Sequence, residues 1–342
     1  MMKIGESIRI LAPQTGLASW VRNWIRPDSR MTGKAVDIQG NPRIPASWPP
    51  LYLSLCGLSP FSKRLSLQFS KYSSFPKFFS INTNPKAIIM SPRLLNKICL
   101  ITGTGGSMGR AAALKFAQEG AKIVGCDINT VTDAATVEAV RELGGEMISM
   151  SPCDLTKREN CEQLVNLAIE TYGRIDALYN NAAMAYMSWV DDGKDEDWYK
   201  TIDQELSLVY LLTRVAWPHL KGSGASIINV GSVNGWTAIR LVPGIAHTAA
   251  KGGVIAMTRQ LAMEGRAHGI RANSISPGLI ETLQTAPLLA DPEWTESLLQ
   301  QIMIGRIGQP EEVAAVASFL ASDESSYITA ADIRVDGGMT GW

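Results

Sequence analysis

The sequence predicts an α/β fold: a single doubly wound domain with helices on both faces of a parallel sheet. From Leu94 to the C-terminus, short apolar runs alternate with helical patterns, and about seven of these runs are predicted as strands. The runs do not alternate between apolar and polar residues, which is expected of strands buried on both faces. At residues 98–117 a strand, a glycine turn and a helix follow one another, which is typical of a Rossmann-type domain.

The glycine turn predicts a site for linked phosphates. Ile98–Ile101 is the predicted strand, residues 103–106 form the turn, and the helix begins at Ser107. This order places free backbone N–H groups and the positive end of a helix where a pyrophosphate can lie. Asp127 ends the next apolar run, KIVGCD, at the spacing expected for a carboxylate that binds a ribose.

The remaining elements continue the alternation. The other predicted strands are residues 122–127, 147–151, 177–180, 226–230, 271–276 and 333–335. The other predicted helical regions are residues 133–143, 157–172, 195–220, 246–267 and 311–321. This number of strands in roughly 250 residues predicts one domain rather than two.

The first 89 residues differ from the rest in composition and are predicted to be a disordered extension to a domain that spans residues 90–342. They carry 12 Lys/Arg and 3 Asp/Glu, are rich in Ser and Pro, and show no stable period. Prolines interrupt the uncharged run at residues 44–61, which argues against a membrane helix. Two alternatives stay open: an organelle transit peptide, or an upstream stretch that is not translated, with Met90 as the start.

Charge and cysteines exclude some function classes. Residues 90–342 carry 20 Lys/Arg and 29 Asp/Glu, and such an acidic body argues against nucleic-acid binding. The five cysteines form no CxxC pair, which favours a reducing compartment and argues against a structural zinc site. We predict no metal site.

Eight motifs occur in one order along the body: TGTGGSMG (102–109), the acid at 127, CDLT (153–156), NNAA (180–183), VGSVNG (230–235), AHTAAKGG (246–253), NSISPG (273–278) and VDGG (335–338). In these motifs the chain resembles the short-chain dehydrogenase/reductase family from about Leu94 to Trp342. The resemblance implies nicotinamide-dependent hydride transfer between an alcohol and a carbonyl.

The resemblance also implies a set of cofactor residues: Gly103, Ser107, Met108, Gly109, Asp127, Asp154, Asn181, Lys251, Pro277 and Gly278. Ser107 stands where many members have a glycine. A carboxylate at Asp127 repels a 2′-phosphate and no Lys or Arg follows at residues 128–129, which favours NAD over NADP. Asp154 has two interpretations, an adenine contact or the N-cap of the next helix.

The implied catalytic site is irregular at two positions. The family usually places a tyrosine four residues before the lysine, whereas this chain has His247 before Lys251. Residues four apart share a helix face, so both side chains should point at one site. Glu205, in TIDQEL, occupies the place of a usual asparagine, and Ser232 fits the family's hydroxyl that orients the substrate.

We therefore hypothesise that His247 accepts the alcohol proton, with Ser232 bonding the substrate oxygen and Lys251 fixing the nicotinamide ribose. Glu205 pairs with Lys251 or His247, or else faces solvent or another subunit. The competing interpretation is an inactive site, in a protein that binds NAD as a sensor or a structural subunit. Residues 279–302 are expected to form a mobile lid over an apolar secondary alcohol or ketone. Tyr186, Trp189 and Trp236 either line the substrate pocket or pack helices.

The resemblance further suggests a homodimer or homotetramer. We expect a cytoplasmic protein, or an organellar one if residues 1–89 are a transit segment.

Overall fold

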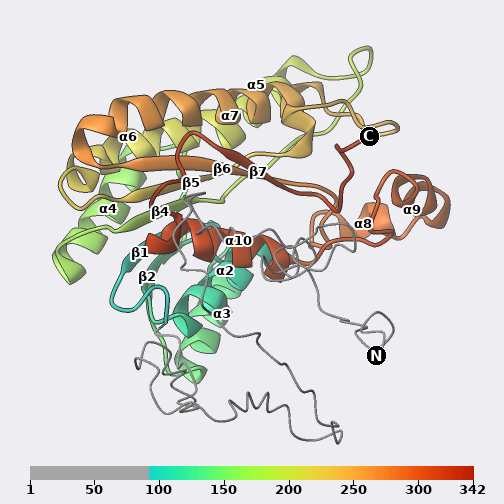
Figure 1. Cartoon of the computed structure of the whole chain (residues 1–342). Coiled ribbons are helices and arrows are strands. Elements are labelled where there is room, and N and C mark those ends of the chain that lie inside the picture. Colours follow the sequence, from blue (N-terminus) through green and yellow to red (C-terminus); the bar gives the residue numbers. More distant parts are fainter. Residues whose placement is uncertain (1–91) are drawn as a thin grey trace, which may run out of the picture. The chain divides into compact units, whose positions relative to one another are not determined.

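The computed structural model describes residues 92–342. Seven strands form one parallel sheet in the order β3-β2-β1-β4-β5-β6-β7 (Figure 1). The strands are β1 (Ile98–Thr102), β2 (Lys122–Cys126), β3 (Glu146–Met150), β4 (Ala177–Asn180), β5 (Ser226–Val230), β6 (Arg271–Pro277) and β7 (Asp332–Val335). The predicted doubly wound parallel sheet is confirmed, and every predicted strand lies within one residue of its observed bounds at each end.

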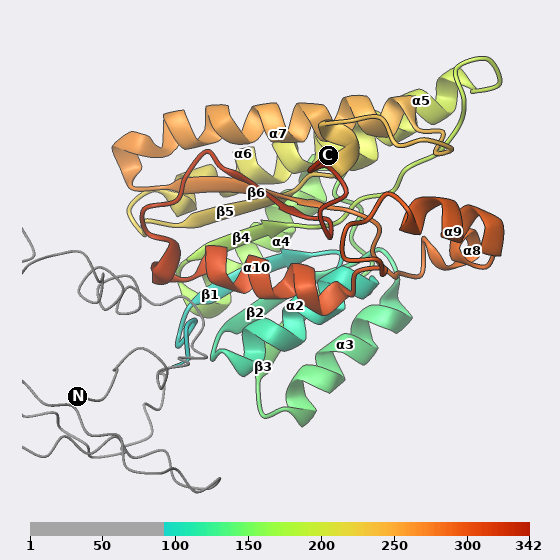
Figure 2. The ribbon, with the colours of Figure 1, turned by 45° about the vertical axis from the view of Figure 1, so that its right-hand side comes forward.

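Helices cover both faces of this sheet. The α-helices of the described residues are α2 (Ser107–Gln118), α3 (Thr130–Glu142), α4 (Arg158–Tyr172), α5 (Asp195–Ile202), α6 (Leu208–Leu220), α7 (Ile245–Gly265), α8 (Ala286–Leu289), α9 (Pro292–Leu299) and α10 (Pro310–Ala321). Helices α2, α3 and α10 lie on one face, and α4, α6 and α7 on the other (Figure 2). Both faces are therefore buried, as expected for strands without apolar/polar alternation.

Small side chains allow α2 and α10 to pack closely on one face of the sheet. Ala112 and Ala113 of α2 and Ala317 of α10 are fully buried, so the two helices can approach each other closely over the sheet. Phe116 stacks on Tyr179 of β4 with 6.2 Å between ring centroids. This stacking fixes the later turns of α2 against β4.

The winding of the sheet reverses between β1 and β4. The chain proceeds from β1 to β2 and β3 on one side, and then returns to β4, which pairs directly with β1. In open parallel sheets, ligands bind outside the carboxyl ends of the strands at such a reversal. The expected cofactor motifs follow β1 and β4 at this edge.

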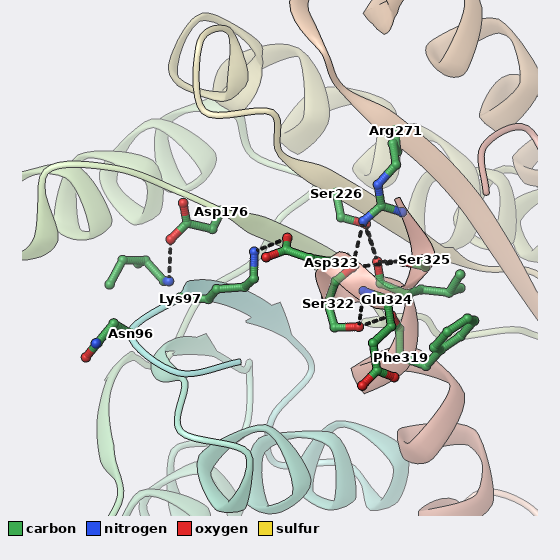
Figure 3. Close-up of polar contacts among 12 residues, drawn as sticks. Asn96, Lys97, Asp176, Ser226, Arg271, Phe319, Ser322, Asp323, Glu324 and Ser325 are labelled. Atoms are coloured by element: carbon green, nitrogen blue, oxygen red, sulfur yellow. Dashed lines mark hydrogen bonds and ion pairs between the residues drawn. The ribbon is translucent and has the colours of Figure 1, made fainter. Parts of the chain in front are cut away.

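The opposite edge of the sheet, at the amino ends of the strands, is fastened by polar contacts (Figure 3). Asp176 accepts the backbone N–H of Ile98 at 2.7 Å, and Lys97 pairs with Asp323 at 2.7 Å. Arg271, at the start of β6, donates to the carbonyl oxygens of three residues, which lie at the end of α10 and beyond it: Leu320, Ser322 and Ile328. Guanidinium donors thus satisfy carbonyls that the end of a helix leaves free.

The helical regions differ from the sequence predictions in three places. The region predicted at residues 195–220 is divided by a π-helical segment, Asp203–Ser207. Helix α3 begins three residues before its predicted start, because the side chain of Asn129 accepts two N–H groups of its first turn. The predicted lid contains two short helices, α8 and α9, which the sequence did not indicate.

The disordered extension and the transit alternative concern residues 1–89, which lie outside the described residues. None of the helices in residues 92–342 has the length and apolarity that a membrane span requires.

Candidate active site

The loop between β1 and α2 has no room for side chains at two glycines. Gly103 has a φ of +72°, and a Cβ there would lie 3.0 Å from both the Asn181 Nδ2 atom and the Ala182 Cα atom. A Cβ on Gly109 would lie 1.9 Å from the carbonyl oxygen of Gly103. The backbone of α2 therefore lies directly against the loop, with the N–H groups of its first turn at the carboxyl edge of the sheet.

Asn181 ties the end of β4 to the end of β1. Its Nδ2 donates to the carbonyl oxygen of Thr102 at 2.9 Å, and the Thr102 hydroxyl accepts the N–H groups of Asn181 and Ala182, each at 2.9 Å. The Oδ1 atom of Asn181 is buried and has no hydrogen-bond partner among residues 92–342. Asn181 thus supports the loop through its Nδ2 atom and backbone N–H, while its Oδ1 atom accepts no hydrogen bond from the described residues.

Asp127 lies at the end of β2 beside the same loop. Its Oδ2 accepts the N–H of Gly105 at 2.8 Å, and its Oδ1 accepts the N–H of Asn129 at 2.7 Å. The carboxylate is therefore held in one orientation next to the predicted pyrophosphate loop, which is where a ribose would follow the phosphates.

Two more predicted cofactor positions have clear local structure. Asp154 is not the N-cap of α4, which is Lys157; instead its Oδ1 accepts the N–H and the hydroxyl of Thr156 in a turn before the helix. Gly278, directly after Pro277 at the end of β6, cannot carry a side chain because a Cβ would lie 2.7 Å from the Cα of Asp336.

Four predicted catalytic side chains meet beyond the end of β5. The Nδ1 atom of His247 lies 2.7 Å from Oε2 of Glu205, and its Nε2 atom lies 3.3 Å from Oγ of Ser232. Lys251, one turn after His247 on α7, donates to the carbonyl oxygen of Val230 at 3.1 Å and lies 3.6 Å from Oε1 of Glu205. Glu205 thus contacts both His247 and Lys251, and it does not face solvent.

The environment of Glu205 favours its ionised form. Its side chain is 3% exposed, and this burial opposes ionisation. The ammonium of Lys251 and the hydrogen bond from His247 outweigh the burial, so the pKa of Glu205 lies below its usual value. Both oxygens of this buried carboxylate are paired, which offsets the free-energy cost of removing its charge from water.

The π-helical segment positions this carboxylate. Glu205 lies in its middle, and the N–H of Leu208 bonds the carbonyl of Asp203, five residues earlier. One extra residue in a turn rotates the following side chains relative to a regular helix, and such turns occur frequently at functional sites. The segment lies against α7, which carries His247 and Lys251.

A methionine lies close to the backbone that precedes His247. A Cβ on Gly244, just before α7, would lie 3.1 Å from Cε of Met187 and 3.8 Å from Cβ of His247. Trp236 instead lies at the surface, where its indole donates to Asp332 at 2.8 Å and its ring faces Arg259. The ring of Trp236 therefore contacts helix α7 through Arg259, as the helix-packing interpretation expects, and a role in the substrate pocket stays a prediction.

The lid contacts the start of α2. The N–H of Leu283 donates to the Oγ of Ser107 at 3.1 Å, and the side-chain amide of Gln284 lies 3.7 Å from the sulfur of Met184. A cavity of about 390 Å³ lies at the base of the lid, between residues such as Ile302 and Gly337. Ser107 thus connects the predicted phosphate loop to the predicted lid.

Comparison with known proteins identifies the family. Residues 103–340 match the family described as "Enoyl-(Acyl carrier protein) reductase". The chain is 41% identical over 250 residues to 3-oxoacyl-[acyl-carrier-protein] reductase FabG of Thermotoga maritima, a match that covers 72% of this chain and 99% of that protein. It is 35% identical to cyclohexanol dehydrogenase of an Acinetobacter species, covering 74% and 98%. A short-chain type dehydrogenase/reductase of Mycobacterium marinum superposes with a TM-score of 0.69 at 28% identity, covering 73% and 98%.

The chain belongs to the short-chain dehydrogenase/reductase family. Its matched relatives are oxidoreductases that act on alcohols or ketones, and members of the family use nicotinamide cofactors. The fold and the glycine loop described above agree with this membership.

Sequence reasoning missed two residues of this short-chain dehydrogenase/reductase site. Met184 and Met187 follow the NNAA motif by only a few positions; both are exposed, Met184 beside Gln284 and Met187 beside Gly244. An exposed methionine directly after a cofactor motif is the signal that could have identified them. In residues 92–342 no group of three or more His, Cys, Asp or Glu side chains is arranged to hold a metal.

Proposed function

We propose that this short-chain dehydrogenase/reductase oxidises an apolar secondary alcohol with NAD, and that His247 accepts the alcohol proton. The observation that carries the proposal is a contact between the two positions where the chain departs from its family's pattern. His247 and Glu205 are 42 residues apart in sequence, yet their side chains lie 2.7 Å apart. Paired departures of this kind indicate a rebuilt catalytic site rather than a decayed one.

The hydrogen bond to Glu205 determines which ring nitrogen of His247 carries the proton. Because an ionised Glu205 only accepts hydrogen bonds, the Nδ1 atom of His247 must donate to it. In the neutral ring the Nε2 atom is then an acceptor, directed toward Ser232 and the substrate side. A positioned imidazole of this kind can take a proton from an alcohol directly or through one water.

Ser232 and Lys251 take the supporting roles. The Ser232 hydroxyl lies beside Nε2 of His247 and can bond the substrate oxygen at the same time. Val230 and Glu205 face two of the three N–H donors of the Lys251 ammonium. The third is assigned to the nicotinamide ribose, so that Lys251 orients the cofactor.

The cofactor assignment rests on the loop and on Asp127. The closely packed glycines, Gly103 and Gly109, leave backbone where a pyrophosphate would approach. The fixed carboxylate of Asp127, followed by the uncharged residues 128–129, suits a ribose with free hydroxyls and repels a 2′-phosphate. NAD, when bound there, would accept the hydride from the alcohol carbon.

The experiment is turnover of NAD⁺ by the purified full-length chain with a panel of apolar secondary alcohols. We expect the parent to form NADH, and His247→Ala to lower kcat about 10²–10⁴-fold while NADH binding persists. His219→Ala, an exposed histidine in the last turn of α6, is the matched control and should leave kcat unchanged. A parent that binds NADH but turns over none of the alcohols would support the sensor or structural-subunit interpretation instead.

Native mass measurement of the same preparation tests the proposed homodimer or homotetramer. A single chain mass at assay concentration would contradict it.

A further inference from the structure

Three side chains form a continuous line that ends at a serine. Glu205 comes from the π-helical segment, His247 from the first turn of α7, and Ser232 from the turn after β5. The line runs from the carboxylate to Nδ1 at 2.7 Å and from Nε2 to Oγ at 3.3 Å. A nucleophile, a base and a group that orients the base are recognised by this geometry rather than by sequence order.

The proton positions suit activation of Ser232. Glu205 accepts the Nδ1 proton of His247, which leaves Nε2 as an acceptor in the neutral ring. The Ser232 hydroxyl then donates to Nε2, while its oxygen accepts the N–H of Asn234 at 3.1 Å. Both contacts hold Oγ in one position and direct its proton toward the base.

The surroundings of Ser232 suit a small apolar acyl group. Ser232 and His247 are only partly buried, whereas Glu205 is buried behind them. Met187, which is 43% exposed, approaches the backbone that precedes His247. Ser232 and His247 thus form the more exposed end of the line of three side chains, and an apolar thioether lies beside that end.

We propose that Ser232 is also a nucleophile toward esters of short apolar acids, in a step that needs no cofactor. The Oγ atom forms a bond to the carbonyl carbon as its proton passes to Nε2 of His247. The bond from that carbon to the alcohol oxygen breaks, and the departing oxygen takes the proton from Nε2. Water then attacks the acyl-serine by the same route, which releases the acid and restores Ser232; no atom changes its oxidation state.

The test is hydrolysis of p-nitrophenyl butyrate by the full-length chain with no nicotinamide cofactor present. We expect nitrophenolate release at least about tenfold faster than in Ser232→Ala, and a butyryl group on the peptide that contains Ser232. Ser223→Ala, a serine that bonds only backbone carbonyls at the far edge of the sheet, is the matched control and should retain the parent rate.

The roles of the other two residues have separate readouts. His247→Ala should lose the activity and regain part of it when free imidazole is added, which a misfolded variant would not do. Glu205→Gln should slow acylation by about tenfold or more, because the amide no longer selects the Nδ1-protonated ring.

Equal rates in the parent and Ser232→Ala, or butyryl found only on other residues, would overturn the proposal. Because the assay contains no NAD, its result is independent of the alcohol-oxidation assay. If the parent lacks one of the two activities, the other activity is still tested by its own assay.

Discussion

Adding one methyl group to Gly109 should separate dinucleotide binding from folding. The Cβ of Gly109→Ala would lie 1.9 Å from the carbonyl oxygen of Gly103, where ordinary contacts are 3.4–4 Å. The start of α2 and the loop must therefore move apart by about 1.5 Å, and a displacement near 1 Å at a binding site can cost about 100-fold. We expect the Kd for NAD to rise about 100-fold or more, equivalent to about 2.7 kcal/mol.

The same substitution should leave the protein folded. Overpacking costs about 1–3 kcal/mol, whereas alanine gains about 1 kcal/mol over glycine inside a helix. The expected net loss of about 0–2 kcal/mol is small beside a typical total stability of about 5–15 kcal/mol. It should lower Tm by only a few degrees, roughly 2–4 °C per kcal/mol for a chain of this size.

Calorimetric titration with NAD and thermal unfolding measure the two effects. Gly106→Ala is the matched control, because its Cβ would meet nothing closer than 3.4 Å and its φ of −84° suits any residue. We expect the control to bind NAD within about threefold of the parent. If Gly109→Ala binds NAD as tightly as the parent does, the assignment of the pyrophosphate to this loop is wrong.

Three further predictions concern the charges and the lid. Because the folded-state pKa of Glu205 lies below the ordinary 4.5, its ionised form stabilises the fold above that pH, and this contribution is lost as the pH falls through the folded pKa. The free energy of unfolding of Glu205→Gln should therefore fall less steeply with decreasing pH than that of the parent. Identical curves would contradict the buried pairing. Arg271→Met should lower the free energy of unfolding by about 2 kcal/mol through the loss of three carbonyl contacts, without changing the Kd for NAD measured by calorimetry. Ser107→Gly should cost less than about 1 kcal/mol but speed hydrogen exchange at the N–H of Leu283, and an unchanged exchange rate would refute the contact between lid and loop.

The fold was predictable because its signals are local. Ile98–Thr102 and Ser226–Val230 are buried at every position, so their apolar runs mark strands directly. The glycine loop was predictable for the same reason, since backbone conformation and close approach require glycine at Gly103 and Gly109.

The catalytic contacts were less predictable because they join distant segments. The sequence places His247 and Lys251 on one helix face, but it leaves Glu205 with several partners. The π-helical turn that directs Glu205 inward changes no hydrophobic period, so no pattern in residues 195–220 indicates it. The sequence left two interpretations of Trp236 open, because a surface indole and a pocket indole have the same sequence signature.

The polar fastening at the amino ends of the strands has a consequence for engineering. Strands of about five residues put roughly 17 Å between that edge and the edge that carries His247. Exchanging the lid, residues 279–302, or the methionines after NNAA leaves Asp176, Arg271 and their contacts untouched. A library confined to those segments therefore keeps this fastening, provided that its members retain the buried lid residues Ile280, Leu298 and Ile302.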